Sequence, residues 1–169
     1  MEELKQIEVY RQNASYARQH GEMAVYQRSN VANVACRNAI EEAIRQNFDG
    51  MHLDVRGAKK VLETFGAPRV LLVLANTVQQ KAWDGRFSVE NRKWAQTYEL
   101  PVDEELAGDR RSAYVVQSHP AVLDGFIQQT RRLVQERELQ QNKVCLQDKL
   151  HLAKLPAQPK KSRAAAQER

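Results

Sequence analysis

The fold depends on the stretch Gly66-Ala67-Pro68-Arg69-Val70-Leu71-Leu72-Val73-Leu74-Ala75. Pro68 suits the first turn of a helix, where its missing N–H costs nothing. We predict a helix over 69–82 that starts apolar on every side and therefore forms the buried centre of a helical bundle. Val70–Leu74 could instead form a short buried strand, because periodicity does not separate the two. We favour a helix because residues 76–82 continue without a turn signal.

Three helices are predicted before this stretch. The first spans about 3–20 and stops at Gly21, which can adopt the left-handed conformation. The second spans about 22–47, and its apolar stripe is rich in alanine, which allows close helix–helix approach. The third begins at Asp54 as N-cap and ends near Phe65.

The remaining elements are predicted from caps and breakers. Ser88 caps a short helix, residues 100–108 form an acidic irregular connection, and Ser118-His119-Pro120 starts the last core helix. A narrower apolar stripe then resumes, consisting of Leu139, Leu146, Leu150 and Ala153. The prediction is an all-α protein with a compact multi-helix domain over 1–136, an appended extended helix over 137–155 and a disordered basic tail over 156–169.

The composition indicates an ordinary globular protein, which we expect to be cytoplasmic. Of the 169 residues, 28% are charged and 42% hydrophobic, and no apolar run approaches the ~20 residues that span a bilayer. The polar N-terminus does not resemble a signal peptide. Cys36 and Cys145 lack metal-ligand spacing, so we expect reduced thiols and neither a metal nor a cofactor.

The net charge of +5 is concentrated at the C-terminal end. Residues 157–169 contain four cations and one anion, so +3 lies there and only +2 remains for residues 1–156. We therefore expect a near-neutral body with a basic tail, which could contact nucleic acid non-specifically through Lys160, Lys161 and Arg163.

No sequence motif of catalysis is present. We find no HExxH, no GxSxG and no glycine-rich phosphate loop, so we expect no enzymatic activity. His119 is interpreted as closing a helix N-terminus, and Asp124 as lying in the first turns, where the dipole favours it. Cys36 is interpreted as a small buried hydrophobe. A DNA-reading helix-turn-helix over 54–82 is rejected, because its second helix is too apolar to face a groove.

The paired cations within residues 1–156 can be interpreted in two ways. Arg92-Lys93, Arg110-Arg111 and Arg131-Arg132 could form solvated helix surfaces or contact phosphates. The loop Trp83-Asp84-Gly85-Arg86-Phe87-Ser88 can also be interpreted in two ways. Its composition is that of an interface hot spot, or Trp83 and Phe87 pack inward while Asp84 caps the turn. Arg86 is expected to point outward in both cases.

Several strings, in order, resemble an uncharacterised family, a domain of unknown function from gut Clostridia and related Firmicutes that occurs on phages and conjugative elements. The resemblance covers roughly residues 8–136. The matching strings are Asn33–Cys36, Phe48–Leu53, Leu74–Gln79, Trp83–Ser88 and Ser118–Phe126.

The resemblance implies a mobile-element protein similar to the anti-CRISPR inhibitors of type II RNA-guided DNA nucleases. Since the chain is net positive, mimicry of DNA is disfavoured, and binding to the nuclease–guide RNA complex fits better. The residues expected to contact the partner are Trp83, Asp84, Arg86, Arg92, Lys93, Arg110, Arg111, His119, Arg131 and Arg132. The alternatives are a nucleic-acid-binding accessory of a phage or conjugative element and, third, a small enzyme. The oligomeric state is left open.

Overall fold

The structure is a computed structural model that describes residues 3–100 and 110–154. The chain divides into two units, Met1–Val134 and Gln135–Arg169. The predicted acidic connection after Leu100 and the predicted basic tail, with Lys160, Lys161 and Arg163, lie outside the described residues.

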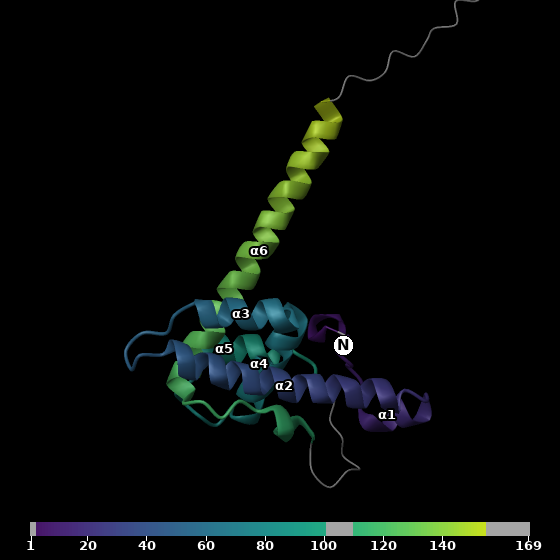
Figure 1. Ribbon diagram of the computed structural model, residues 1–169, viewed down its shortest axis with the longest axis vertical. Coiled ribbons are helices and arrows are strands. Elements are labelled where there is room, and N and C mark those ends of the chain that lie inside the picture. Colours follow the sequence, from purple (N-terminus) through teal and green to yellow (C-terminus); the bar gives the residue numbers. More distant parts are fainter. Residues whose placement is uncertain (1–2, 101–109, 155–169) are drawn as a thin grey trace, which may run out of the picture. The chain divides into compact units, whose positions relative to one another are not determined.

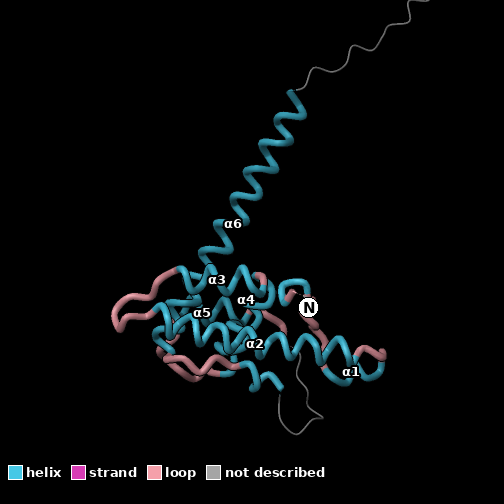
Figure 2. Tube along the Cα trace, in the orientation of Figure 1, coloured by secondary structure: helices cyan, strands magenta, loops and turns pink. Residues whose placement is uncertain are grey.

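The described residues confirm the all-α prediction (Figures 1 and 2). The extended pairing found among them is an isolated bridge between Phe48 and Leu53. The helices are η1 (Leu4–Gln6), α1 (Ala14–Gln19), α2 (Met23–Asn47), α3 (Arg56–Phe65), α4 (Ala67–Gln80), α5 (Val89–Gln96), η2 (Arg110–Tyr114) and α6 (Pro120–Lys154).

Helix α4 forms the centre of the core, as the sequence predicts. Gly66 adopts a φ of 82°, which an L side chain would strain, and this separates α3 from α4. Pro68 lies in the first turn, and Val70–Leu74 is helical rather than extended. Nearly the whole helix is buried, so it cannot read a DNA groove.

The other helices of the first unit surround α4. Helix α2 packs on α3 and α4, and α5 packs on α4, while the start of α6 adds Leu123, Phe126 and Ile127 to the same core. The close approach expected of the alanine-rich α2 occurs at Gly57, where an added Cβ would lie 3.3 Å from the carbonyl oxygen of Ala43. Cys36 is buried in this core, and burial raises the pKa of its thiol to about 12.

The predicted first helix over 3–20 is wrong. Only 4–6 and 14–19 are helical, and the segment between them is irregular, with bends at Ile7 and Gln12. The carbonyl oxygens of Ile7 and Glu8 accept hydrogen bonds from Arg69, and Tyr10 N–H donates to Ser29 Oγ. These tertiary bonds replace helical ones, and Asn13 caps α1 by accepting from Tyr16 N–H at 2.8 Å.

Two other boundaries differ from the prediction. Val55, not Asp54, is the N-cap of α3, although Asp54 Oδ1 accepts from Arg56 N–H at 2.9 Å. The last core helix and the predicted appended helix form one continuous helix, α6, whose residues from 135 to 154 are exposed.

Among the described residues, no single helix is both long enough and apolar enough to cross a bilayer. Helices α3 and α4 together have a sufficient length and apolar composition, but the chain bends by 115° between them.

Candidate functional site

The loop over 83–88 holds a buried carboxylate against an exposed guanidinium. Asp84, only 5% exposed, accepts from Arg86 at the backbone N–H (3.0 Å), Nε (3.0 Å) and Nη2 (2.8 Å). Phe87 is buried, whereas Trp83 is 80% exposed. The inward-packing reading is therefore right for Phe87 and Asp84, which anchor the loop, and wrong for Trp83, which faces solvent. Arg86 is exposed, as expected.

The ion pair predicts the acid titration of this loop. Hydrogen bonds from the Arg86 side chain and backbone lower the pKa of Asp84 from 3.8 to about 2. Because the pKa is lowered on folding, the stabilisation is present above about pH 4 and lost as the pH falls towards 2. We expect the NMR titration midpoint of the Asp84 carboxyl near pH 2, rising in Arg86→Gln but not in Arg45→Gln. A midpoint near pH 4 in the parent protein would contradict the ion pair.

Two of the strings that match the family, Trp83–Ser88 and Ser118–Phe126 (called here the signature strings), meet at Asp124. Its Oδ1 accepts from Ser88 N–H at 2.9 Å and from Asn91 Nδ2 at 2.8 Å, and its carbonyl oxygen also accepts from Asn91 Nδ2. Ser88 in turn caps α5, accepting from Asn91 N–H at 3.2 Å. Asp124 was expected to interact with the helix dipole, but these direct bonds join the start of α5 to α6 across 33–36 residues of sequence.

Arg131 extends this network. Its Nη1 donates to Asn91 Oδ1 at 2.8 Å, and its guanidinium carbon lies 5.2 Å from the centre of the Trp94 ring. Since its side chain is mostly buried there, Arg131 is a structural residue, whereas the neighbouring Arg132 is exposed.

The other paired cations are only partly brought together. Arg92 and Lys93 lie on α5, the helix that Arg131 contacts. Lys93 is exposed, while Arg92 Nε is buried and has no hydrogen-bond partner within 3–100 or 110–154. Arg110 and Arg111 lie in η2, which is fixed to α4 by a 2.9 Å bond from Asn76 Nδ2 to the Arg111 carbonyl oxygen. The side chain of Arg110 lies outside the described residues.

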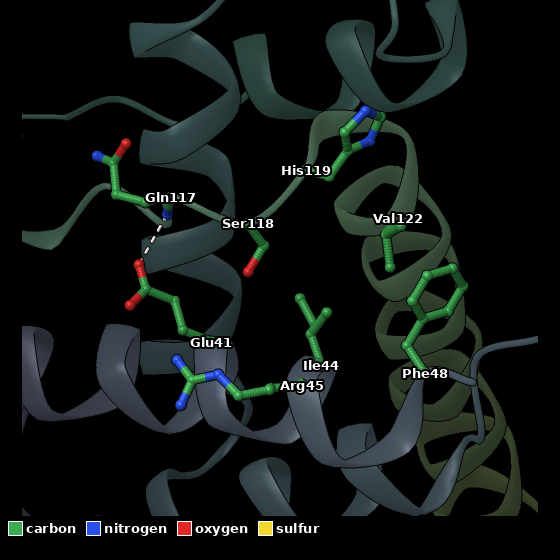
Figure 3. A pocket seen from close by; sticks show the side chains of 8 residues that line it. All are labelled: Glu41, Ile44, Arg45, Phe48, Gln117, Ser118, His119 and Val122. Carbon is green, nitrogen blue, oxygen red and sulfur yellow. Dashed lines mark hydrogen bonds between the residues drawn. The ribbon is translucent and has the colours of Figure 1, made fainter. Parts of the chain in front are cut away.

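A hollow of about 450 Å³ lies between α2 and the start of α6. Figure 3 shows Glu41 and Ile44 on α2, and Phe48 directly after it, on one side of the hollow, with Ser118 and Val122 on the other. His119 closes the helix N-terminus as expected, because its Nδ1 accepts from Ala121 N–H at 3.2 Å.

The polar residues of this hollow are engaged in structural bonds. Glu41 Oε1 accepts from Gln117 N–H at 2.8 Å and from Arg37 Nε at 3.2 Å. No hydrogen bond joins Glu41 or His119 to the Ser118 hydroxyl among the described residues, so the three do not form the proton relay of a nucleophilic triad. Over the same residues, no group of three or more His, Cys, Asp or Glu could hold a metal ion.

A family model described as a protein of unknown function, DUF3849, matches residues 9–135. The chain belongs to this family. No curated protein matches the chain, and no solved structure does. The matched segment of the DUF3849 chain contains both signature strings and ends at the boundary between the two units.

The sequence reasoning missed Arg69 of the DUF3849 chain. This side chain is 1% exposed, and its Nη1 donates to Asn33 Oδ1 and, at 2.9 Å, to the Ser29 carbonyl oxygen. Its Nη2 donates to the carbonyl oxygens of Ile7 and Glu8. Burial lowers its pKa, yet a guanidinium remains charged. One sequence signal could have identified Arg69 as a buried structural residue: it is a single cation at the start of the most apolar helix.

Proposed function

We propose that this DUF3849 protein is a non-catalytic mobile-element inhibitor that binds a type II RNA-guided nuclease loaded with its guide RNA. The family resemblance implies the class of partner. The observation that carries the binding role is Trp83, an exposed indole on a loop anchored from beneath by Asp84 and Phe87. Trp and Arg dominate binding energy at protein interfaces, and a loop that is already ordered loses little entropy on binding.

The charge distribution supports binding to a complex rather than mimicry of DNA. Residues 1–156 are close to balanced at +2, so the body lacks the dense negative charge of a phosphate backbone. Exposed cations, including Arg86, Lys93 and Arg132, are available beside nucleic acid held by a partner.

The test is a DNA-cleavage assay with the nuclease and its guide RNA, together with a direct binding measurement. We expect inhibition and a stable complex, and Trp83→Ala should weaken binding by roughly thirtyfold or more, as a hot-spot truncation does. Met51→Ala is the matched control, because Met51 is 83% exposed on another loop and should leave binding within about twofold. Full cleavage at saturating protein, without a complex, would overturn the proposal for that nuclease.

The second candidate, a nucleic-acid-binding accessory, is favoured by the +3 charge of residues 157–169. A gel shift on the same mixtures separates the two. Salt-dependent binding to free DNA that is lost when residues 157–169 are removed would favour the accessory. Binding that requires the nuclease and survives this removal would favour the inhibitor.

A further inference from the structure

Large apolar side chains are exposed along the second half of α6. Residues 135–154 are exposed throughout, and the leucines at 139, 146 and 150 are each 58–60% exposed. Val144 and Leu152 are also exposed. Most of the stability of a protein helix comes from packing of its apolar face, so a helix with this much apolar surface in water gains stability from a partner that covers it.

The spacing of these side chains is that of a coiled-coil seam. Leu139, Leu146 and Ala153 recur at intervals of seven residues. Leu150 lies four residues after Leu146 and three before Ala153. The alternation of four and three assigns Leu150 to heptad position a and the other three residues to position d. Val144 and Leu152 then fall at positions b and c, outside the seam.

The polar members of the seam disfavour a parallel pair of chains. Glu136 and Lys143 occupy position a in the two heptads before Leu150. In a parallel dimer in register, each a side chain faces the same residue of the second copy, so both positions would bring like charges together. Lys149 at position g would also lie beside Lys154 at position e of the second copy.

An antiparallel pair avoids these like-charge layers, because position a of one helix then faces position d of the other. The layers that result, each occurring twice, are Leu139 opposite Leu150, Lys143 opposite Leu146 and Glu136 opposite Ala153. The aliphatic stem of Lys143 can cover Leu146 while its ammonium group stays in water. Residues 135–154 carry four cations and three anions, so two copies approach without strong net repulsion.

We propose that the protein forms a homodimer through an antiparallel coiled coil of α6 over residues 136–153. The seam is complementary to its own reverse, and this property points to a second copy of the chain as the partner. The proposal does not depend on the binding role of Trp83, which lies in the other unit, so each can fail alone.

Sedimentation equilibrium of the full chain tests the pairing. We expect a reversible equilibrium between monomer and dimer. Leu146→Gln with Leu150→Gln should raise the dimer Kd by roughly a hundredfold or more, because four buried leucines per dimer are lost. Val144→Gln with Leu152→Gln is the matched control, since these exposed apolar residues of the same helix lie outside the seam, and it should change the Kd by less than about twofold.

Two results of this measurement would overturn the proposal. One is a chain that stays monomeric up to about 1 mM, where an association this weak would have no structural meaning. The other is an equal loss of dimer in the seam variant and in its control.

Spin labels test the direction of pairing. Cys145 is exposed and Cys36 is buried, so Cys145 can be labelled alone. A second chain carries Glu138→Cys with Cys145→Ser, which moves the label by one heptad and keeps it at position c. In the antiparallel pair, residue 145 lies level with residue 144 of the second copy, whereas residue 138 lies level with residue 151.

The label–label distance should therefore be longer at 138 than at 145. The two labels at 138 are 13 residues apart along the pair, about 20 Å at the rise of a helix, whereas those at 145 are nearly level. Double electron–electron resonance measures both distances. Equal distances at the two positions would show parallel pairing and would contradict the antiparallel dimer.

Discussion

Replacing Arg69 with methionine should lower the free energy of unfolding by about 3–5 kcal/mol, because several acceptors lose their only side-chain donor at once. Methionine fills much of the space but donates no hydrogen bond, so the carbonyl oxygens of Ile7, Glu8 and Ser29 and the amide oxygen of Asn33 lose their donor. Each buried acceptor left without a partner costs about 1–3 kcal/mol, partly recovered by water. Denaturant unfolding followed by circular dichroism measures the loss, and the melting temperature should fall by roughly 10 °C.

Arg45→Met is the matched control for this substitution. The Arg45 side chain is 71% exposed and pairs with Glu42 one turn away, so its loss should change stability by less than about 0.5 kcal/mol. Equal stability of the Arg69 and Arg45 variants would show that Arg69 does not hold the N-terminal segment. A further sign of its role is that amide exchange at residues 7–10 should accelerate in Arg69→Met before the rest of the core is affected.

Asp124→Ala should cost about 2–3 kcal/mol, because hydrogen bonds to a charged group are the stronger ones: Ser88 N–H loses its acceptor, and Asn91 Nδ2 keeps only the carbonyl oxygen of residue 124. The donors are Ser88 N–H and Asn91 Nδ2, both at the start of α5. The effect should be largest in α5 and in the loop over 83–88, which NMR shifts of Trp83 and Trp94 report separately.

Two further variants define the role of Asp124. Asp124→Asn keeps an oxygen at the Oδ1 position and should recover about half of the lost stability. Asp148→Ala removes an exposed carboxylate from the same helix and should be nearly neutral. If Asp124→Ala and Asp148→Ala proved equally neutral, the bonds of the Asp124 carboxylate would contribute nothing to stability, and its structural role would be refuted.

Local sequence signals were sufficient to predict where most of the helices lie. Gly66, Pro68 and the apolar run after Arg69 specified α4, and Ser88 was identified as the cap of α5. Each signal acts within a few residues, where cap and turn chemistry dominates.

Long-range polar contacts were beyond sequence reasoning. The segment over 7–13 is not helical because Ile7 and Glu8 are bonded to Arg69, about 60 residues away, and these bonds override a helical apolar spacing. The role of Asp124 depends in the same way on Ser88, 36 residues earlier. Periodicity carries no information about which distant polar groups will meet.

The signature strings owe much of their composition to architecture. Asp84, Phe87, Ser88 and Asp124 are buried or bonded within the first unit, which leaves Trp83 and Arg86 as the exposed members of their loop. Sequence alone could not separate these classes, because anchors and exposed residues alternate within a few positions.

The hydrogen bonds of Arg69 also bear on the order in which the chain can assemble during synthesis. Every acceptor of this side chain precedes it, at residues 7, 8, 29 and 33, so the cluster can close once α4 has left the ribosome. The link between Ser88 and Asp124 must wait for a later segment. The N-terminal half can therefore reach its native topology first and serve as a template on which α5 and the start of α6 dock.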